Sequence, residues 1–108
     1  MSKSMSDDRR IPVVFGVQPQ AADAVLVEEG VAAPAVGYVV RYAAAGHALG
    51  CLCCVGQSPA GTALGVAFRA RATGAAPFFA RVVVLGDEAP VRAALAQDVM
   101  AKARFRVG

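Results

Sequence analysis

Apolar residues occur along this chain in short runs separated by glycine and proline, which is the pattern of alternating strands and helices. Residues 11–15 end at Gly16 and predict a strand, in which Pro12 is tolerated only near the start of the strand or at a sheet edge. Residues 36–42 are β-branched and aromatic and predict a second strand. Residues 79–85 predict the strongest strand, because their unbroken apolar end is typical of a parallel strand buried on both faces.

The segments between these runs contain turns and helix signals. Residues 21–29 are ambiguous, but their apolar side chains fit a helical spacing, and Gly30 is a suitable stop. Residues 47–53 are a further candidate strand. Ser58-Pro59 is typical of a helix start, with an N-cap followed by proline at the first helical position. This helix is predicted to run to about Thr73, with a glycine after it.

The last third of the chain predicts another helix, which begins after Asp87 and has Pro90 in its first turn. Its expected buried face consists of Val91, Ala94, Leu95 and Val99. Strands and helices therefore alternate, which predicts an α/β fold with a small, mostly parallel sheet flanked by helices. The polar residues 1–10 predict a flexible N-terminal arm, and residues 11–108 predict a single α/β domain.

Composition and charge exclude several classes of protein. The 108 residues are 56% hydrophobic, which excludes a disordered chain, but only 6% are aromatic, so small side chains form the core. The net charge of +3 is too small and too scattered to indicate nucleic-acid binding. Residues 1–10 lack the apolar segment of a secretory signal, and residues 42–68 are uncharged but too often interrupted for a membrane span. We therefore expect a soluble, cytoplasmic protein without a nucleic-acid or membrane partner.

The segment with the strongest chemical character is Gly-Cys-Leu-Cys-Cys at positions 50–54. In a reducing cytoplasm, three thiols this close favour metal or thiol chemistry over a structural disulfide. Cys51, Cys53 and Cys54 supply three soft ligands for Zn²⁺ or Cu⁺, provided that the chain turns at Cys53-Cys54. His47, a solvent molecule or a group from a partner would be the fourth ligand. The alternative is that the three cysteines are small, buried apolar residues.

Gly50-Cys51-Leu52-Cys53-Cys54 resembles the G-C-[IL]-C-C motif of the CobW-like GTP-binding proteins, which include metallochaperones for zinc or cobalt. Arg81-Val82-Val83-Val84 resembles the hydrophobic strand that follows in that family. Asp87-Glu88-Ala89-Pro90-Val91 resembles its D-P-A-P-V sequence, and residues 91–105 are similar to the helix after it. The resemblance covers about half of the chain, from residue 48 to residue 106. It implies an incomplete, CobW-type P-loop NTPase domain.

The nucleotide-binding motif of that family is missing from this chain. A P-loop needs the pattern G-x-x-x-x-G-K-[ST], in which backbone N–H groups and the lysine hold the phosphates. The corresponding residues here are 16–23, where the first glycine remains. Ala21, Ala22 and Asp23 stand in place of the second glycine, the lysine and the hydroxyl residue. We therefore expect a non-catalytic protein that binds zinc or another soft metal through its cysteines and binds no nucleotide.

Two other functions remain open. The first is an interaction module that forms a homo-oligomer or docks on a complete CobW-like GTPase, because a truncated sheet leaves an unpaired edge. The second is a thiol redox protein acting through Cys53 and Cys54, which requires thiols activated by a nearby helix N-terminus. The arginines at positions 69, 71 and 81 are interpreted as ordinary surface charge.

Overall fold

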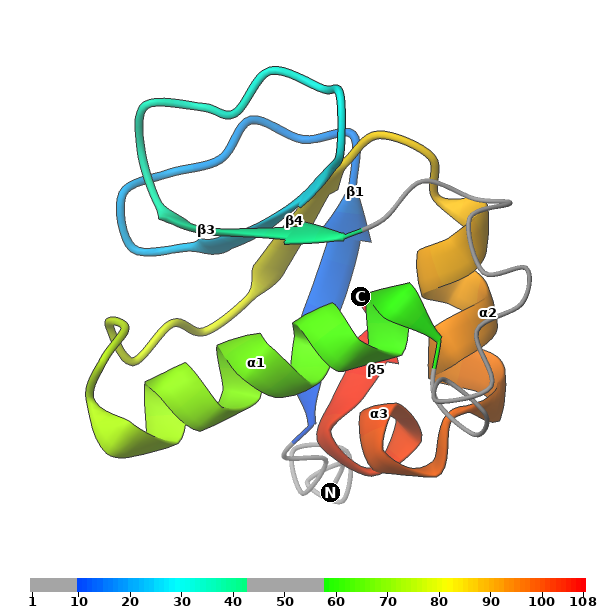
Figure 1. Ribbon diagram of the computed structural model, residues 1–108. Helices are drawn as coiled ribbons and strands as arrows, with labels where there is room; N and C mark the ends of the chain where they lie inside the picture. Colours follow the sequence, from blue (N-terminus) through cyan, green and yellow to red (C-terminus); the bar gives the residue numbers. More distant parts are fainter. Residues whose placement is uncertain (1–9, 43–57) are drawn as a thin grey trace, which may run out of the picture.

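The computed structural model describes residues 10–42 and 58–108, which form one sheet flanked by helices (Figure 1). Every strand pair in the sheet is parallel, and the strand order is β3-β2-β4-β1-β5. The α/β class and the parallel sheet expected from the sequence are therefore confirmed. The strands are β1 (Ile11–Phe15), β2 (Ala24–Glu28), β3 (Tyr38–Tyr42), β4 (Val82–Leu85) and β5 (Phe105–Val107), and the helices are α1 (Pro59–Thr73), α2 (Ala89–Gln97) and α3 (Val99–Arg104).

The three helices pack against one face of the sheet. Successive side chains of a strand point to opposite faces, so alternate strand residues reach the helices. Figure 1 shows α1 lying across this face, with α2 and α3 beside it. The core between sheet and helices includes Ile11, Val13, Ala24, Leu26, Tyr42, Val82, Val84 and Phe105 from the strands and Leu64, Ala67, Val91 and Leu95 from the helices.

The centre of the opposite face is covered by connecting loops. Val25, Val27 and Val83 point to this face, and all three are fully buried although none belongs to the core shared with the helices. Gly37, in the connection between β2 and β3, lies so close to Val25 that a Cβ built on the glycine would be 2.8 Å from Val25 Cγ2. The same position is 3.4 Å from the carbonyl oxygen of Gln20, in the connection between β1 and β2. These two loops therefore pack together where a crossover helix usually covers a parallel sheet.

β2 shows that the helix suggested for residues 21–29 is wrong. Residues 24–28 are extended and pair with β3 on one side and with β4 on the other. Four consecutive residues, 24–27, are buried, so both faces of the strand are covered. A short apolar run of this kind also satisfies a helical spacing, and the β-branched Val25 and Val27 are the better guide.

The boundaries of α1 agree with the prediction. Ser58 caps the helix, because its Oγ accepts a hydrogen bond from the backbone N–H of Gly61 at 3.0 Å. Gly74 ends the helix in the left-handed conformation, with φ of 85°. The strand predicted over 11–15 is also confirmed. β1 is an interior strand, and Pro12 is tolerated there because it is the second residue of the strand.

The C-terminal region differs from the single helix expected after Asp87. Asp98 is extended, so it ends α2, and its Oδ1 caps α3 by accepting hydrogen bonds from Met100 N (3.0 Å) and Ala101 N (3.2 Å). Val99, expected on the buried face, is turned outward and is 76% exposed. Residues 105–107 form β5, which pairs with β1, so they do not continue a helix. An aspartate can interrupt a helix in this way because its side chain competes for backbone N–H groups.

The two described stretches of chain, 10–42 and 58–108, both contribute strands to the sheet and side chains to its core. The strand suggested over residues 47–53 lies outside the described residues. A search of the helices in the described stretches finds none with the length and apolar character that a membrane crossing requires.

Candidate functional site

The predicted metal-binding segment connects two well-defined elements, because β3 ends at Tyr42 and α1 begins at Pro59. In residues 10–42 and 58–108, no group of three or more His, Cys, Asp or Glu side chains is arranged to hold a metal ion. The expected ligands, Cys51, Cys53, Cys54 and His47, lie outside the described residues.

The carboxyl ends of the strands lie at one end of the sheet, because the strands are all parallel. In open parallel sheets, ligands bind at this end, where the connections from neighbouring strands leave in opposite directions. β1 and β4 are such neighbours. The connection after β1 leads to β2, beyond β4, and the connection after β4 leads to β5, beyond β1. A ligand site of this fold is therefore expected among the loops at this carboxyl end.

A polar cluster of Glu28, Tyr42 and Asp87 joins the carboxyl ends of β2, β3 and β4. The Tyr42 hydroxyl donates to the carbonyl oxygen of Asp87 (2.8 Å), and the backbone N–H of Asp87 donates to Glu28 Oε1 (2.9 Å). Burial, together with the negative charges of Glu28 and Asp87, raises the pKa of Tyr42 to about 12. Gly86 permits this close approach, since a Cβ on it would be 2.6 Å from Glu28 Cβ. Tyr42 is thus a neutral donor that anchors the end of β3.

The carboxyl end of β1 carries a cation over an aromatic ring. The Arg92 guanidinium lies 4.2 Å from the centroid of the Phe15 ring, and it also donates to Glu88 Oε1 at 3.1 Å. The ion pair is exposed, so it contributes little to stability. Asp87 Oδ1 accepts a hydrogen bond from Ala89 N at 3.0 Å, as expected for an acid at the start of a helix. The contacts of these two acids are therefore those of capping and of an intrahelical ion pair.

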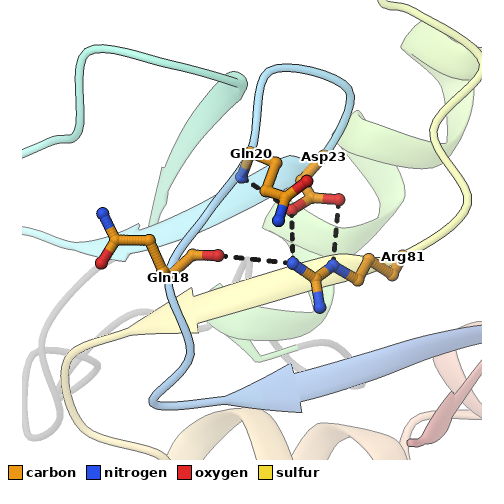
Figure 2. Close-up of polar contacts among 4 residues, drawn as sticks. All are labelled: Gln18, Gln20, Asp23 and Arg81. Carbon is orange, nitrogen blue, oxygen red and sulfur yellow. Dashed lines mark hydrogen bonds and ion pairs between the residues drawn. The ribbon is translucent and has the colours of Figure 1, made fainter.

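The loop that stands in place of a P-loop crosses the sheet and leads into a strand. It leaves β1 at Gly16 and reaches Asp23 at the amino end of β2. There the Asp23 carboxylate binds Arg81 through two contacts, Nε–Oδ1 of 3.0 Å and Nη2–Oδ2 of 2.9 Å (Figure 2). Arg81 also donates to the carbonyl oxygen of Gln18 at 3.3 Å. The hydrogen bond from Arg81 lowers the pKa of Asp23 despite its burial. Arg81, interpreted from the sequence as surface charge, therefore fastens this loop to the start of β4.

A buried carboxylate lies at the start of α1. Asp98 is 8% exposed, and its Oδ2 is buried without a hydrogen-bond partner among the described residues. This oxygen points at Gly61 in the first turn of α1: a Cβ built on Gly61 would overlap Oδ2 and would lie 3.2 Å from Ser58 Oγ. Sequence reasoning missed this contact. The one signal for it is a glycine inside a helix, where glycine is otherwise unfavourable.

Comparison with known proteins identifies no relative. No family model matches the chain, and neither the search of curated proteins nor the search of solved structures finds a significant match. The resemblance to CobW-like proteins therefore depends on the sequence motifs alone.

Proposed function

We propose that this protein binds a soft metal ion, zinc above all, through the thiolates of Cys51, Cys53 and Cys54, and that it is a non-catalytic relative of the CobW-like proteins. The observation that carries the proposal is the C-x-C-C run between the carboxyl end of β3 and the start of α1. Thiolates are the ligands that select zinc and Cu⁺ over harder cations. Three of them within four positions form a ligand set that needs one more donor for a tetrahedral site.

The anchoring of the two flanking elements supports this proposal. β3 is fixed at its end by the hydrogen bond from Tyr42 to the Asp87 carbonyl oxygen, and the Ser58 cap stabilises the first turn of α1. A metal site benefits when the elements that carry its ligands are held rigidly, because less order has to be created on binding. β3 ends at the carboxyl end of the sheet, where ligand sites of parallel sheets lie.

The proposal includes the loss of nucleotide chemistry. The lysine and the hydroxyl residue of a P-loop are missing from residues 16–23, and the loop after β1 leads into β2. A P-loop leads into a helix whose N-terminus faces the phosphates. Incubation with GTP and Mg²⁺ should therefore release no more phosphate than a protein-free blank. Phosphate release in proportion to protein concentration would refute this part of the proposal.

Metal binding is tested on reduced protein from which metal has been removed with a chelator. We expect one zinc ion per chain in competition with a chromophoric zinc dye, and Co²⁺ in its place should give thiolate-to-metal charge-transfer absorption. The variants C51S, C53S and C54S should each weaken binding, whereas Thr62→Ala, an exposed change on α1, should not. A wild-type protein that takes no zinc from the dye, or a triple serine variant that binds as tightly, would refute the proposal.

A second candidate function, an interaction module, is favoured by the position of β3 at the edge of the sheet that the described residues form. Tyr38 N donates to Asp23 O, and Tyr42 O accepts from Glu29 N, so alternate residues of β3 bond to β2. The backbone groups of the residues between them, Val39 and Arg41, therefore point away from β2. Such groups can pair with a strand of a second copy or of a complete CobW-like GTPase.

Sedimentation equilibrium tests the homo-oligomer that this edge would form. An oligomer that dissociates in Val39→Pro, which removes an outward N–H group, would support pairing through β3. The matched control is Val36→Pro, a substitution before the strand begins. A protein that stays monomeric at all micromolar concentrations would argue against this function.

A further inference from the structure

The loop between α1 and β4, residues 74–80, is apolar and yet exposed. It consists of glycine, alanine, proline and phenylalanine, so it has no polar side chain. Phe78 is 76% exposed, and Pro77 and Ala80 are exposed beside it. Figure 1 shows this loop at the far left of the view, beyond the end of α1. Exposed apolar patches rimmed by polar residues mark surfaces that bind another molecule.

The loop is held in its shape by its own buried residues and by α1. Ala76 and Phe79 are buried, and the backbone N–H of Ala76 donates to the carbonyl oxygen of Ala70 at 3.0 Å. Arg71 Nε donates to the carbonyl oxygen of Phe79 at 2.8 Å. Phe78 is therefore presented to solvent by a fixed loop, so little order has to be created when another molecule covers it.

Cations lie beside this loop and along the same side of α1. The Arg71 guanidinium lies 3.7 Å from the centroid of the Phe78 ring. The Arg104 guanidinium lies 4.4 Å from the ring centroid of Phe68, which precedes Arg71 by three residues and so lies on the same side of the helix. Neither arginine forms an ion pair with a described acid. An apolar tip thus adjoins a positively charged helix side.

The combination of an apolar tip and uncompensated cations identifies the occupant. We propose that the 74–80 loop binds the surface of an anionic lipid bilayer, with the Phe78 ring in the interfacial region and Arg71 at the lipid phosphates. Apolar side chains that enter the interface and cations that meet anionic headgroups are the two contributions that hold peripheral proteins on membranes. A single-stranded nucleic acid fits less well, because its binding sites stack successive bases on several rings, and this loop exposes Phe78 alone.

The inference goes beyond metal binding and does not depend on it, because residues 74–80 and Arg71 have no part in the proposed metal site. The expectation of no membrane partner concerned spanning segments. A loop that binds at a bilayer surface needs no such segment, so the lack of a membrane-crossing helix in the described stretches is compatible with the proposal.

A fluorescence experiment tests whether the loop enters the bilayer. The sequence contains no tryptophan, so Phe78→Trp places a single reporter in the loop. We expect its emission to move to shorter wavelength when vesicles containing phosphatidylserine are added, and to be quenched by lipids with brominated acyl chains. The matched control is Val99→Trp, because Val99 is also 76% exposed but lies on α3. The emission of the control should not change.

Cosedimentation with the same vesicles measures the affinity of unlabelled protein. Phe78→Ala should bind at least about tenfold more weakly, because the ring no longer leaves water. Arg71→Gln should bind about fivefold more weakly, and Arg71→Lys, which keeps the charge, should restore most of the affinity. The matched control is Arg92→Gln, because Arg92 also stacks on a ring, that of Phe15, but lies at the carboxyl end of the sheet. Its affinity should stay within about twofold of wild type.

Three results would overturn the proposal. The first is an emission spectrum of Phe78→Trp that does not respond to anionic vesicles. The second is equal binding of wild type to vesicles of neutral phosphatidylcholine, since the cations would then play no part. The third is quenching of Phe78→Trp by a single-stranded oligonucleotide but not by vesicles, which would make the partner a nucleic acid. None of these results bears on zinc binding, so the proposed function stands or falls separately.

Discussion

The two glycines within α1 offer a sharp test of how this helix packs, because they are four residues apart and differ in their surroundings. Around Gly65, the nearest atom to an added Cβ is Arg69 Nη1 at 3.8 Å, which is ordinary van der Waals contact. At Gly61, an added Cβ would overlap Asp98 Oδ2, and Asp98 Cγ would be 3.2 Å away. The same substitution, glycine to alanine, should therefore have opposite effects at the two positions.

The magnitudes follow from helix propensity and from the contact with Asp98. Alanine is favoured over glycine in a helix interior by about 1 kcal/mol, so Gly65→Ala should raise the free energy of unfolding by up to that amount. Gly61→Ala gains the same propensity at most, but the new methyl group must displace the Asp98 side chain. Asp98 then loses the cap of α3, which costs about 1 kcal/mol, and its buried carboxylate loses its packing, which costs about 1–2 kcal/mol more. We expect Gly61→Ala to be destabilised by about 1–2 kcal/mol overall.

Urea denaturation followed by far-ultraviolet circular dichroism measures both variants. For a domain of this size, 1 kcal/mol corresponds to a shift of roughly 4–8 °C in Tm, which thermal melts resolve easily. A double-mutant cycle with Asp98→Ala isolates the contact. Once the carboxylate is gone, Gly61→Ala should be neutral or stabilising. If Gly61→Ala proves as stable as Gly65→Ala in the wild-type background, Asp98 does not pack against α1 as described.

Three further predictions concern other contacts. Tyr42→Phe should be less stable by about 1 kcal/mol at neutral pH, because the hydrogen bond to Asp87 O is lost. Since the pKa of Tyr42 is raised to about 12, wild type should lose about 2 kcal/mol between pH 10 and pH 12, and Tyr42→Phe should lack this loss in alkaline urea titrations. Asp23 has a lowered pKa, so its pair with Arg81 stabilises wild type above the ordinary carboxyl pKa, and that contribution disappears as the pH falls below about 4. In Asp23→Asn, the free energy of unfolding measured by urea denaturation should fall less steeply below about pH 4 than in wild type. The same pH dependence in both proteins would show that the pair is not formed. Val99→Lys should change stability by no more than about 0.5 kcal/mol in thermal melts, whereas a loss above about 2 kcal/mol would place Val99 in the core.

Local chemistry made part of this fold predictable. The limits of α1 were predictable because Ser58 and Gly74 act on the backbone beside them, whatever packs around the helix. β1 was predictable because a short β-branched run that ends at glycine has few alternatives. β4 was predicted three residues too long, since residues 79–81 are apolar or basic but lie before the sheet begins.

Other elements depend on partners distant in the sequence. The sequence of β2 fits a helix as well as a strand. Both of its faces are buried only because it lies between β3 and β4. No local signal predicts the break between α2 and α3 at Asp98 either, because a helix tolerates an aspartate within an alanine-rich stretch at modest cost. β5 exists because its residues extend the sheet beside β1, with Phe105 opposite Ile11. Spacing alone cannot reveal such pairings.

The candidate site also combines a feature that the local sequence predicts with contacts that depend on distant residues. The cysteine motif is visible in the sequence because its chemistry belongs to the residue type. The contacts of the flanking elements, Tyr42 with Asp87 and Asp98 with Gly61, are formed only through the parallel sheet and the packing of α3 on α1. Sequence reasoning therefore proposes the candidate ligands but predicts none of the contacts that the flanking elements make.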